Sequence, residues 1–260
     1  MPLYKLTLEY EGTRYAGWQT QSDGSRSIQG EMIHAGRQLF NTNQLTVYGA
    51  GRTDAGVHAL QQVAHLEVNT TLNPQQIRFG LNDLLPADIV VLQAEKAPPK
   101  FHARHDAIAR SYLYHIANRR TAFGKKLVWW VKDRLNTEAM DNAAQIMEGF
   151  KDFRSFTDPS PEQPSTMVEV HWVRLHEYRH SLFIHITGSH FLWKMVRRMV
   201  GVLVEVGRGR LSEKEVEHLF IQPSREPAQY TAPPSGLYLE RVYYPGQPLQ
   251  TDIQPLLYLL

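Results

Sequence analysis

A short stretch around residue 54 gathers residue types that can do chemistry. Residues 49–59 read Gly-Ala-Gly-Arg-Thr-Asp-Ala-Gly-Val-His-Ala and hold one carboxylate, Asp54, one guanidinium, Arg52, and three glycines. Glycines at this density mark backbone that turns sharply or comes close to another group. In an extended chain Arg52 and Asp54 project to the same side, and a neighbouring cation favours the ionised carboxylate. The pattern predicts either a site built on an aspartate anion or an ordinary polar turn, Thr-Asp-Ala-Gly.

The same stretch carries a family resemblance. Residues 51–59 resemble the signature Gly-Arg-Thr-Asp-x-Gly-Val-His-Ala of the tRNA pseudouridine synthase A (TruA) family. The resemblance implies that Asp54 is the catalytic residue and that the target is uridine in the anticodon stem-loop of tRNA, at the family's positions 38–40. Uracil would leave C1′ at N1, turn and rejoin through C5, so no cofactor is expected. The sequence leaves open whether Asp54 is a nucleophile or a base that removes a sugar proton.

Two further motifs of the same family supply candidate substrate contacts. Residues 110–114 resemble its Arg-x-Tyr-x-Tyr motif, which implies that Tyr112 stacks on an extruded base. Residues 195–201 resemble its Met-Val-Arg-x-x-Val-Gly motif, which implies that Arg197 forms an ion pair with Asp54 and keeps it ionised. The next residue, Arg198, is expected to face solvent or to bind phosphate.

Three other segments complete the expected pocket. Residues 233–239 resemble the family's Ala-Pro-Pro-x-Gly-Leu-x-Leu stretch, so Leu237 is expected on the pocket floor. Arg52 is expected to fill the space that the base vacates or to hold the RNA backbone. Residues 17–21 are expected to support the Asp54 segment and to contact RNA.

The amino-acid composition is compatible with a globular protein but does not by itself indicate a function. The chain has 260 residues, 42% of them hydrophobic and 21% charged, and this is typical of a globular protein with a substantial core. No apolar run approaches the length of about 20 residues that spans a bilayer. The absence of cysteine excludes disulfides and thiolate metal sites. The net charge of +2 does not by itself indicate a nucleic-acid partner.

Basic residues nevertheless cluster in two parts of the sequence, with aromatic residues among them. This arrangement favours a groove that follows a nucleic-acid backbone and stacks its bases, although scattered Lys and Arg are usually solvated surface. The clusters are Arg104, Arg110, Arg119, Arg120, Lys125 and Lys126, and then Lys194, Arg197, Arg198, Arg208 and Arg210.

Two other classes of function stay open. One is an RNA-binding module that has lost catalysis, which the presence of Asp54, Tyr112 and Arg197 disfavours. The other is a metal-assisted hydrolase that uses Asp54, His58 and His102. Neither a Cys partner nor a His-Glu-x-x-His pattern accompanies the histidines, so no metal site is predicted.

The periodicity of apolar residues predicts the order β-α-β-β-α-β in the first part of the chain, which is typical of a ferredoxin-like unit. The expected strands are residues 3–10, 45–48, 62–68 and 89–95, and the expected helices are residues 27–40 and 74–85. After two prolines at 98 and 99 the order recurs with longer elements. The expected strands there are residues 106–117, 166–178, 181–188 and 237–244, and the expected helices are residues 137–147, 191–206 and 212–220.

These elements predict an α+β protein of two ferredoxin-like halves, at residues 1–100 and 101–246, with a C-terminal tail at 247–260. The resemblance implies that the halves pack around a central basic cleft, which is the pseudouridine synthase fold. It also implies that the partner is tRNA and that the protein is a homodimer. No membrane association is expected, the location is expected to be cytoplasmic, and the apolar tail is expected to dock, as at a dimer interface.

Overall fold

The computed structural model describes residues 1–159 and 163–251, which form two compact units. Unit 1 comprises Met1–Ile108 together with Tyr238–Pro248, and unit 2 comprises Ala109–Leu237. The sequence placed the first division at residue 100 and assigned the last strand to the second half. In the structure, unit 1 extends to Ile108 and also includes Tyr238–Pro248. The docking role expected of the tail concerns residues that are mostly outside the described ranges.

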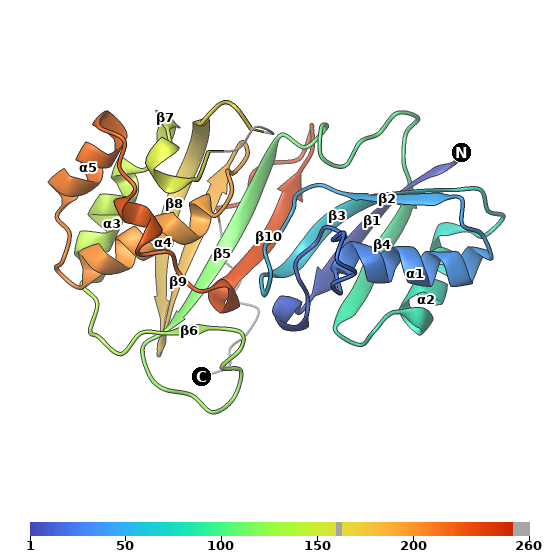
Figure 1. The fold of residues 1–260 in the computed structure, drawn as a ribbon, viewed down its shortest axis with the longest axis horizontal. Helices are drawn as coiled ribbons and strands as arrows, with labels where there is room; N and C mark the ends of the chain where they lie inside the picture. Colours follow the sequence, from blue (N-terminus) through green and yellow to red (C-terminus); the bar gives the residue numbers. More distant parts are fainter. Residues whose placement is uncertain (160–162, 252–260) are drawn as a thin grey trace. The chain divides into compact units, whose positions relative to one another are not determined.

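Unit 1 has the predicted β-α-β-β-α-β order (Figure 1). Its elements are β1 (Leu3–Tyr10), α1 (Ile28–Phe40), β2 (Leu45–Gly49), β3 (His58–Val68), α2 (Pro74–Leu84) and β4 (Ile89–Lys96). The strands form an antiparallel sheet in the order β4-β1-β3-β2. A further strand, β10 (Leu237–Tyr243), pairs in parallel with the beginning of β3, with Tyr238 opposite His58.

Local sequence signals explain where the elements of unit 1 begin and end. In β1 every second residue is buried, and Leu6 and Leu8 are fully inaccessible, as expected of a strand with one face on the core. Helix α1 begins where the Ser27 side chain accepts a hydrogen bond from Gly30 N–H, and it ends at Asn41, whose φ is +47°. The two helices of unit 1 contact each other, and α2 packs on β4.

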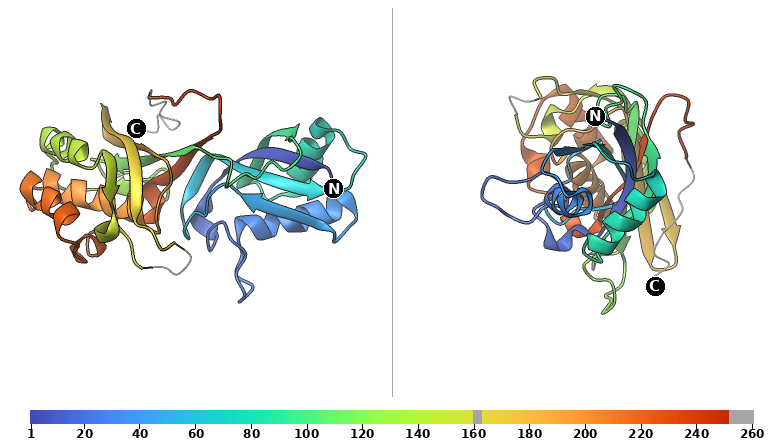
Figure 2. Two further views of the ribbon diagram at one scale, coloured as in Figure 1. Left: turned by 90° about the horizontal axis from the view of Figure 1, so that it is seen from above. Right: turned by 90° about the vertical axis from the view of Figure 1, so that its right-hand side faces the viewer.

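The described part of unit 2 contains four antiparallel strands and three α-helices. Its elements are β5 (Ala109–Ala117), β6 (Trp129–Trp130), α3 (Thr137–Ile146), β7 (Gly149–Asp152), β8 (Met167–Tyr178), β9 (Ser181–Gly188), α4 (Met195–Gly207) and α5 (Glu213–Ile221). The strand order is β7-β8-β9-β5, and β6 pairs in parallel with the end of β5. Figure 2 shows α3, α4 and α5 as a group beside these strands. The prediction of an α+β fold is confirmed.

Helix α4 is shorter than predicted. The sequence placed its start at Phe191, but the helix begins at Met195, because Lys194 adopts a left-handed backbone with φ of +60°. Phe191 is therefore outside the helix, and its ring packs edge-on against Tyr112 with 5.1 Å between ring centroids. From Met195 onward nearly every residue is buried, as expected of a helix that is apolar on all sides.

The described helices include none that is both long and apolar enough to cross a bilayer. The basic cleft expected between the two halves stays a prediction.

A buried histidine in β5 predicts acid sensitivity of the fold. His115 is 2% exposed, its Nε2 lies 2.8 Å from Ser181 Oγ, and burial lowers its pKa from 6.5 to about 4. The unfolded chain therefore takes up a proton below pH 6.5, whereas the folded protein does so only near pH 4. The stability contributed by neutral His115 is complete above pH 6.5 and is lost as the pH falls towards 4, at up to about 1.4 kcal/mol per pH unit. Burial lowers the pKa values of His65, His102 and His190 as well, which adds to the same trend.

Urea unfolding at pH 7 and pH 5 measures this effect. The free energy of unfolding is expected to be lower at pH 5, and the difference is expected to shrink in His115→Gln, which has no proton to take up. An unchanged difference in the variant would exclude His115 as a source of the acid sensitivity.

Candidate active site

Asp54 lies in an irregular loop between β2 and β3 of unit 1. Its side chain is half-buried, and Arg52 is exposed. Val57 N–H donates to Asp54 O over 3.1 Å, and Gly56 has φ of +78°, so residues 54–57 form a β-turn with glycine at its third position. The polar turn and the candidate catalytic loop are therefore the same structure, with Asp54 as the first residue of the turn.

Two buried side chains, from β1 and β3, form hydrogen bonds with this loop. Tyr10 Oη, at the end of β1, lies 2.9 Å from Thr53 Oγ1. Gln62 Nε2, in β3, donates to Gly51 O over 2.9 Å, and Gln62 is fully buried. These two bonds fix the backbone on both sides of Arg52 and limit the freedom of Asp54.

The segment from Gly12 to Trp18 also forms hydrogen bonds with the loop and with the start of β3. Trp18 N–H donates to Thr53 O over 3.1 Å, and Gly12 N–H donates to His58 Nδ1 over 3.0 Å. A Cβ at Gly12 would lie 1.9 Å from Val57 O, so only glycine lets the two backbones meet at this distance. The prediction that residues 17–21 support the Asp54 segment is confirmed for Trp18.

The tyrosine predicted to stack on the base, Tyr112, lies in β5 of unit 2 and is 8% exposed. Two residues on, Tyr114 donates its hydroxyl to Pro233 O over 2.8 Å. Arg110, also in β5, donates from Nη1 to Ser189 O over 3.1 Å. The hydrogen bond from Tyr114 ties β5 to the segment that precedes Leu237.

Arg197 lies in the first turn of α4 and is tied to the same segment. Its Nε donates to Ala232 O over 2.7 Å, and Ala232 N–H donates to Arg197 O over 3.0 Å. One turn later, a Cβ at Gly201 would lie 1.7 Å from Tyr230 O, so glycine permits α4 to approach this segment. The segment continues through a 3-10 helix, Pro234–Gly236, to Leu237, which is 5% exposed.

The environment predicted for Arg198 from the sequence is wrong. It neither faces solvent nor is available to phosphate, because it is 3% exposed and its Nη2 lies 2.7 Å from Asp158 Oδ2. The Arg198 guanidinium holds the pKa of Asp158 below its usual range. Consecutive residues of a helix point about 100° apart, so Arg198 is directed into unit 2 while Arg197 faces the segment at Ala232.

The five predicted site residues thus fall into two groups. Arg52 and Asp54 belong to unit 1, whereas Tyr112, Arg197 and Leu237 belong to unit 2 and are connected through residues 230–236. The ion pair between Arg197 and Asp54 stays a prediction, as do the substrate contacts of all five.

Sequence reasoning missed the residues that hold the loop. Tyr10, Gln62 and Gly12 are 43, 11 and 46 residues away from their partners Thr53, Gly51 and His58, so no local spacing indicates them. Asp158, the partner of Arg198, is equally remote in sequence.

Of the two histidines singled out in the sequence, His58 accepts the hydrogen bond from Gly12 N–H, and His102 has a local role. His102 Nδ1 accepts hydrogen bonds from the N–H groups of Arg104 and His105, and the rings of His102 and His105 are 4.1 Å apart. Over residues 1–159 and 163–251 there is no group of three or more His, Asp or Glu side chains that could hold a metal ion.

The fold and the loop define an α+β protein whose candidate active site is built on one rigidly held aspartate. The chain matches the model of a family described as tRNA pseudouridine synthase, over residues 7–106 and 143–245. Three curated relatives are each named tRNA pseudouridine synthase A. The protein from Nitrobacter hamburgensis is 43% identical over 252 residues, which cover 94% of this chain and all of the relative. The protein from Nitrobacter winogradskyi is 42% identical and covers 97% of this chain, and that from Parvibaculum lavamentivorans is 38% identical and covers 94%; both are matched over their full length.

The chain belongs to the tRNA pseudouridine synthase A family, which is a family of isomerases. A chain from the crystal structure of a Cbf5-Nop10-Gar1 complex is similar with 11% identity and a TM-score of 0.31, covering 77% of this chain and 54% of that one. Similarity at this level adds nothing to the assignment.

Proposed function

We propose that this protein isomerises uridine to pseudouridine in the anticodon stem-loop of tRNA, with Asp54 as the catalytic residue. The observation that carries the proposal is the Asp54 loop, which backbone and side-chain hydrogen bonds fix from β1, β3 and the Gly12–Trp18 segment. Membership of a family whose relatives are named for this activity supports the same reaction.

The reaction breaks the bond between N1 and C1′ and forms one between C5 and C1′, while the proton on C5 is lost and N1 gains one. Atoms and electrons balance without an oxidant or a donated group. Asp54 acts on the sugar, as a nucleophile at C1′ or as the base that removes a sugar proton, and both routes need an ionised carboxylate in a fixed position. Tyr112 stacks on the extruded uracil, and Leu237 forms the floor beneath it.

The cations of the site have separate roles in this proposal. Arg197 pairs with Asp54 and orients its carboxylate, and the position of Arg197 is supported by the hydrogen bond from its Nε to Ala232 O. Arg52 is exposed, so it is available to hold the RNA backbone or to fill the space that the uridine leaves. The protein acts in the cytoplasm, where tRNA is found, and as a homodimer, which sedimentation of the purified protein tests.

Mapping of pseudouridine in unmodified tRNA transcripts tests the reaction. The transcripts are incubated with the protein without added metal or cofactor, treated with carbodiimide and read by primer extension. New stops in the anticodon stem-loop are expected. A transcript that binds the protein but acquires no stop would refute the proposed activity, and stops elsewhere would refute the proposed target.

A further inference from the structure

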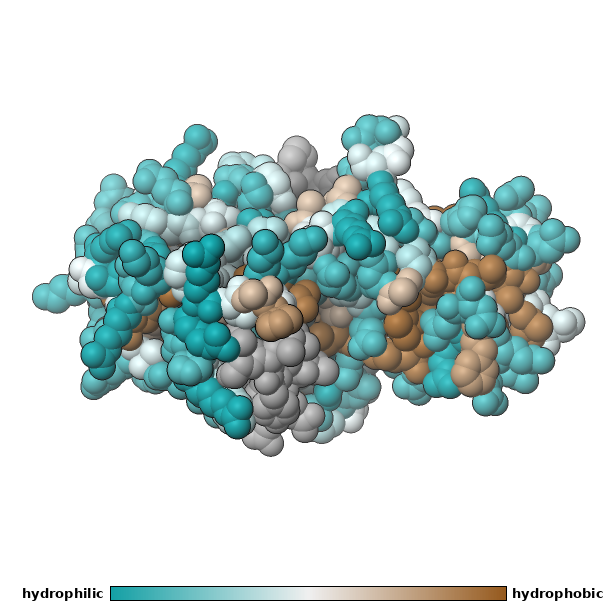
Figure 3. Space-filling view, turned by 90° about the horizontal axis from the view of Figure 1, so that it is seen from below, coloured by the Kyte–Doolittle hydropathy of each residue, from teal (hydrophilic) through white to brown (hydrophobic). Residues whose placement is uncertain are grey.

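A strongly basic surface lies outside the candidate site. Residues 118–134, here called the basic loop, connect β5 with the approach to α3 and are drawn in green below β5 and β6 in Figure 1. The loop contains one carboxylate, Asp133, and six exposed cations, which are Arg119, Arg120, Lys125, Lys126, Lys132 and Arg134. On the face drawn in Figure 3, the described part of unit 2 is predominantly hydrophilic, with long side chains that project into solvent.

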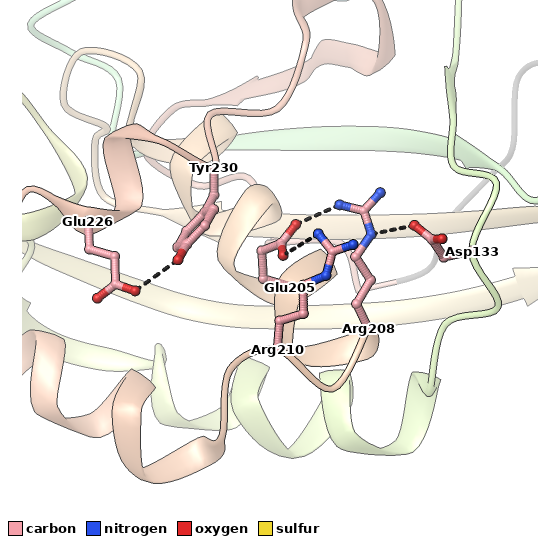
Figure 4. A network of polar contacts seen from close by, with 6 residues as sticks. All are labelled: Asp133, Glu205, Arg208, Arg210, Glu226 and Tyr230. Carbon is pink, nitrogen blue, oxygen red and sulfur yellow. Dashed lines mark hydrogen bonds and ion pairs between the residues drawn. The ribbon is translucent and has the colours of Figure 1, made fainter.

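The charge of the basic loop is not cancelled by neighbouring carboxylates. Its one carboxylate, Asp133, is already paired, because Arg208 Nε lies 2.7 Å from Asp133 Oδ2. Arg208 and Arg210 also share Glu205, at 2.6 Å and 3.3 Å from its two oxygens (Figure 4). This network holds two cations and two anions and is neutral by itself. Within the described residues, none of the six cations of the basic loop is ion-paired with a carboxylate.

The base of the loop is fixed to the body of unit 2. β6 pairs with β5, and Val131 N–H donates to Ala117 O over 3.0 Å. Ser235 Oγ donates to Val128 O over 3.2 Å, and Val128 and Val131 are buried. The cations are thus presented from an anchored scaffold, which lowers the entropy lost when they bind a partner.

Two exposed aromatic residues stand among the cations. Phe123 is 78% exposed and Trp130 is 42% exposed, and the Arg120 guanidinium lies 5.9 Å from the Trp130 ring centroid. Cations that follow a phosphate backbone and aromatic rings that stack on bases are the combination by which proteins bind single strands and loops of RNA. A membrane surface would instead favour a continuous apolar face, and two separate rings do not form one.

We propose that the basic loop binds the phosphate backbone of the RNA substrate, through contacts that take no part in the isomerisation. The identity of the RNA rests on the proposed function, whereas the binding surface rests on the charge, anchoring and aromatic residues of the loop. The surface raises affinity for RNA of any sequence, because phosphate contacts carry no sequence information.

A pair of matched fourfold variants tests the proposal. The loop variant carries Arg119→Gln, Arg120→Gln, Lys125→Gln and Lys126→Gln. The control carries Arg37→Gln, Lys96→Gln, Arg179→Gln and Lys214→Gln, which remove the same charge from exposed positions elsewhere. Kd for unmodified tRNA is measured by filter binding between 50 and 300 mM salt. The loop variant is expected to bind at least about tenfold more weakly and to reduce the slope of log Kd against log salt by about 3, whereas the control stays close to wild type.

The outcomes separate this proposal from the proposed reaction. Equal losses in both variants, or no loss in the loop variant, would overturn the RNA surface even when wild type forms pseudouridine. Loss of binding to vesicles with 30% phosphatidylserine, with tRNA binding intact, would also overturn it in favour of a membrane surface. If the loop variant alone loses tRNA binding while wild type forms no pseudouridine, the surface stands and the reaction fails. The double variant Lys125→Gln, Lys126→Gln repeats the measurement if the fourfold variant does not fold.

Discussion

Asp54→Asn is expected to lower the rate of pseudouridine formation by at least about 10³-fold while Kd for tRNA stays within about threefold of wild type. Asparagine has the size of aspartate and is equally suited to the first position of the turn at residues 54–57, so the loop is expected to keep its shape. What disappears is the carboxylate, and with it both nucleophilic attack at C1′ and removal of a sugar proton. The effect should therefore fall on the chemical step rather than on binding.

Single-turnover experiments with enzyme in excess measure the rate of pseudouridine formation, and filter binding measures Kd for tRNA. Asp83→Asn, which neutralises an exposed carboxylate of α2 in the same unit, is the matched control and should turn over as wild type does. A rate for Asp54→Asn within tenfold of the control would mean that another group does the chemistry.

Gly12→Ala is expected to damage the same loop without touching any group that reacts. The added Cβ would lie 1.9 Å from Val57 O and 2.7 Å from Val57 C, so one backbone must move, and the bond from Gly12 N–H to His58 Nδ1 is strained with it. Overpacking of this kind costs about 1–3 kcal/mol, and a displacement of about 1 Å at a catalytic group costs about 10²-fold in rate. We expect a lower melting temperature and a rate reduced by about that factor.

The control for this variant lies in the Asp54 loop itself. A Cβ at Gly51 would meet nothing within 4 Å, and Gly51 does not have positive φ, so Gly51→Ala should unfold at the temperature of wild type. Thermal unfolding followed by circular dichroism, with single-turnover rates below the transition, compares the two. Equal melting temperatures and rates for Gly12→Ala and wild type would show that the close approach to Val57 is not needed.

The fold was predictable where local patterns are strong. The strand predicted at residues 3–10 and the helices predicted at 27–40, 74–85 and 212–220 agree with β1, α1, α2 and α5 to within a few residues. The pattern of apolar residues gave wrong element boundaries where the backbone conformation or tertiary contacts override it. The apolar run from Phe191 suggested helix, but the left-handed backbone at Lys194 delays the start of α4, and the short strands β6 and β7 have too few residues to show a period.

The candidate site was predictable only in part, for a similar reason. Asp54 and Arg52 were visible because they share one short stretch with three glycines. Tyr10 and Gln62 are ordinary residues of strands, and their hydrogen bonds to the loop exist only once β1 and β3 are paired. Arg198 differs from Arg197 by one position, and the sequence does not reveal which of the two finds a carboxylate inside unit 2.

The place of β10 has a consequence for how this protein matures on the ribosome. Unit 1 takes its last strand from Tyr238–Tyr243, and Tyr238 stacks on His58, the first residue of β3 after the Asp54 loop, with 4.8 Å between ring centroids. The two partners are 180 positions apart in the sequence, and Ala109–Leu237 of unit 2 is translated between them. A nascent chain that ends before residue 238 therefore lacks the strand that pairs with β3 just after the Asp54 loop, even when β1 to β4 have already paired. Unit 1 is therefore completed only late in translation, when β10 pairs with β3.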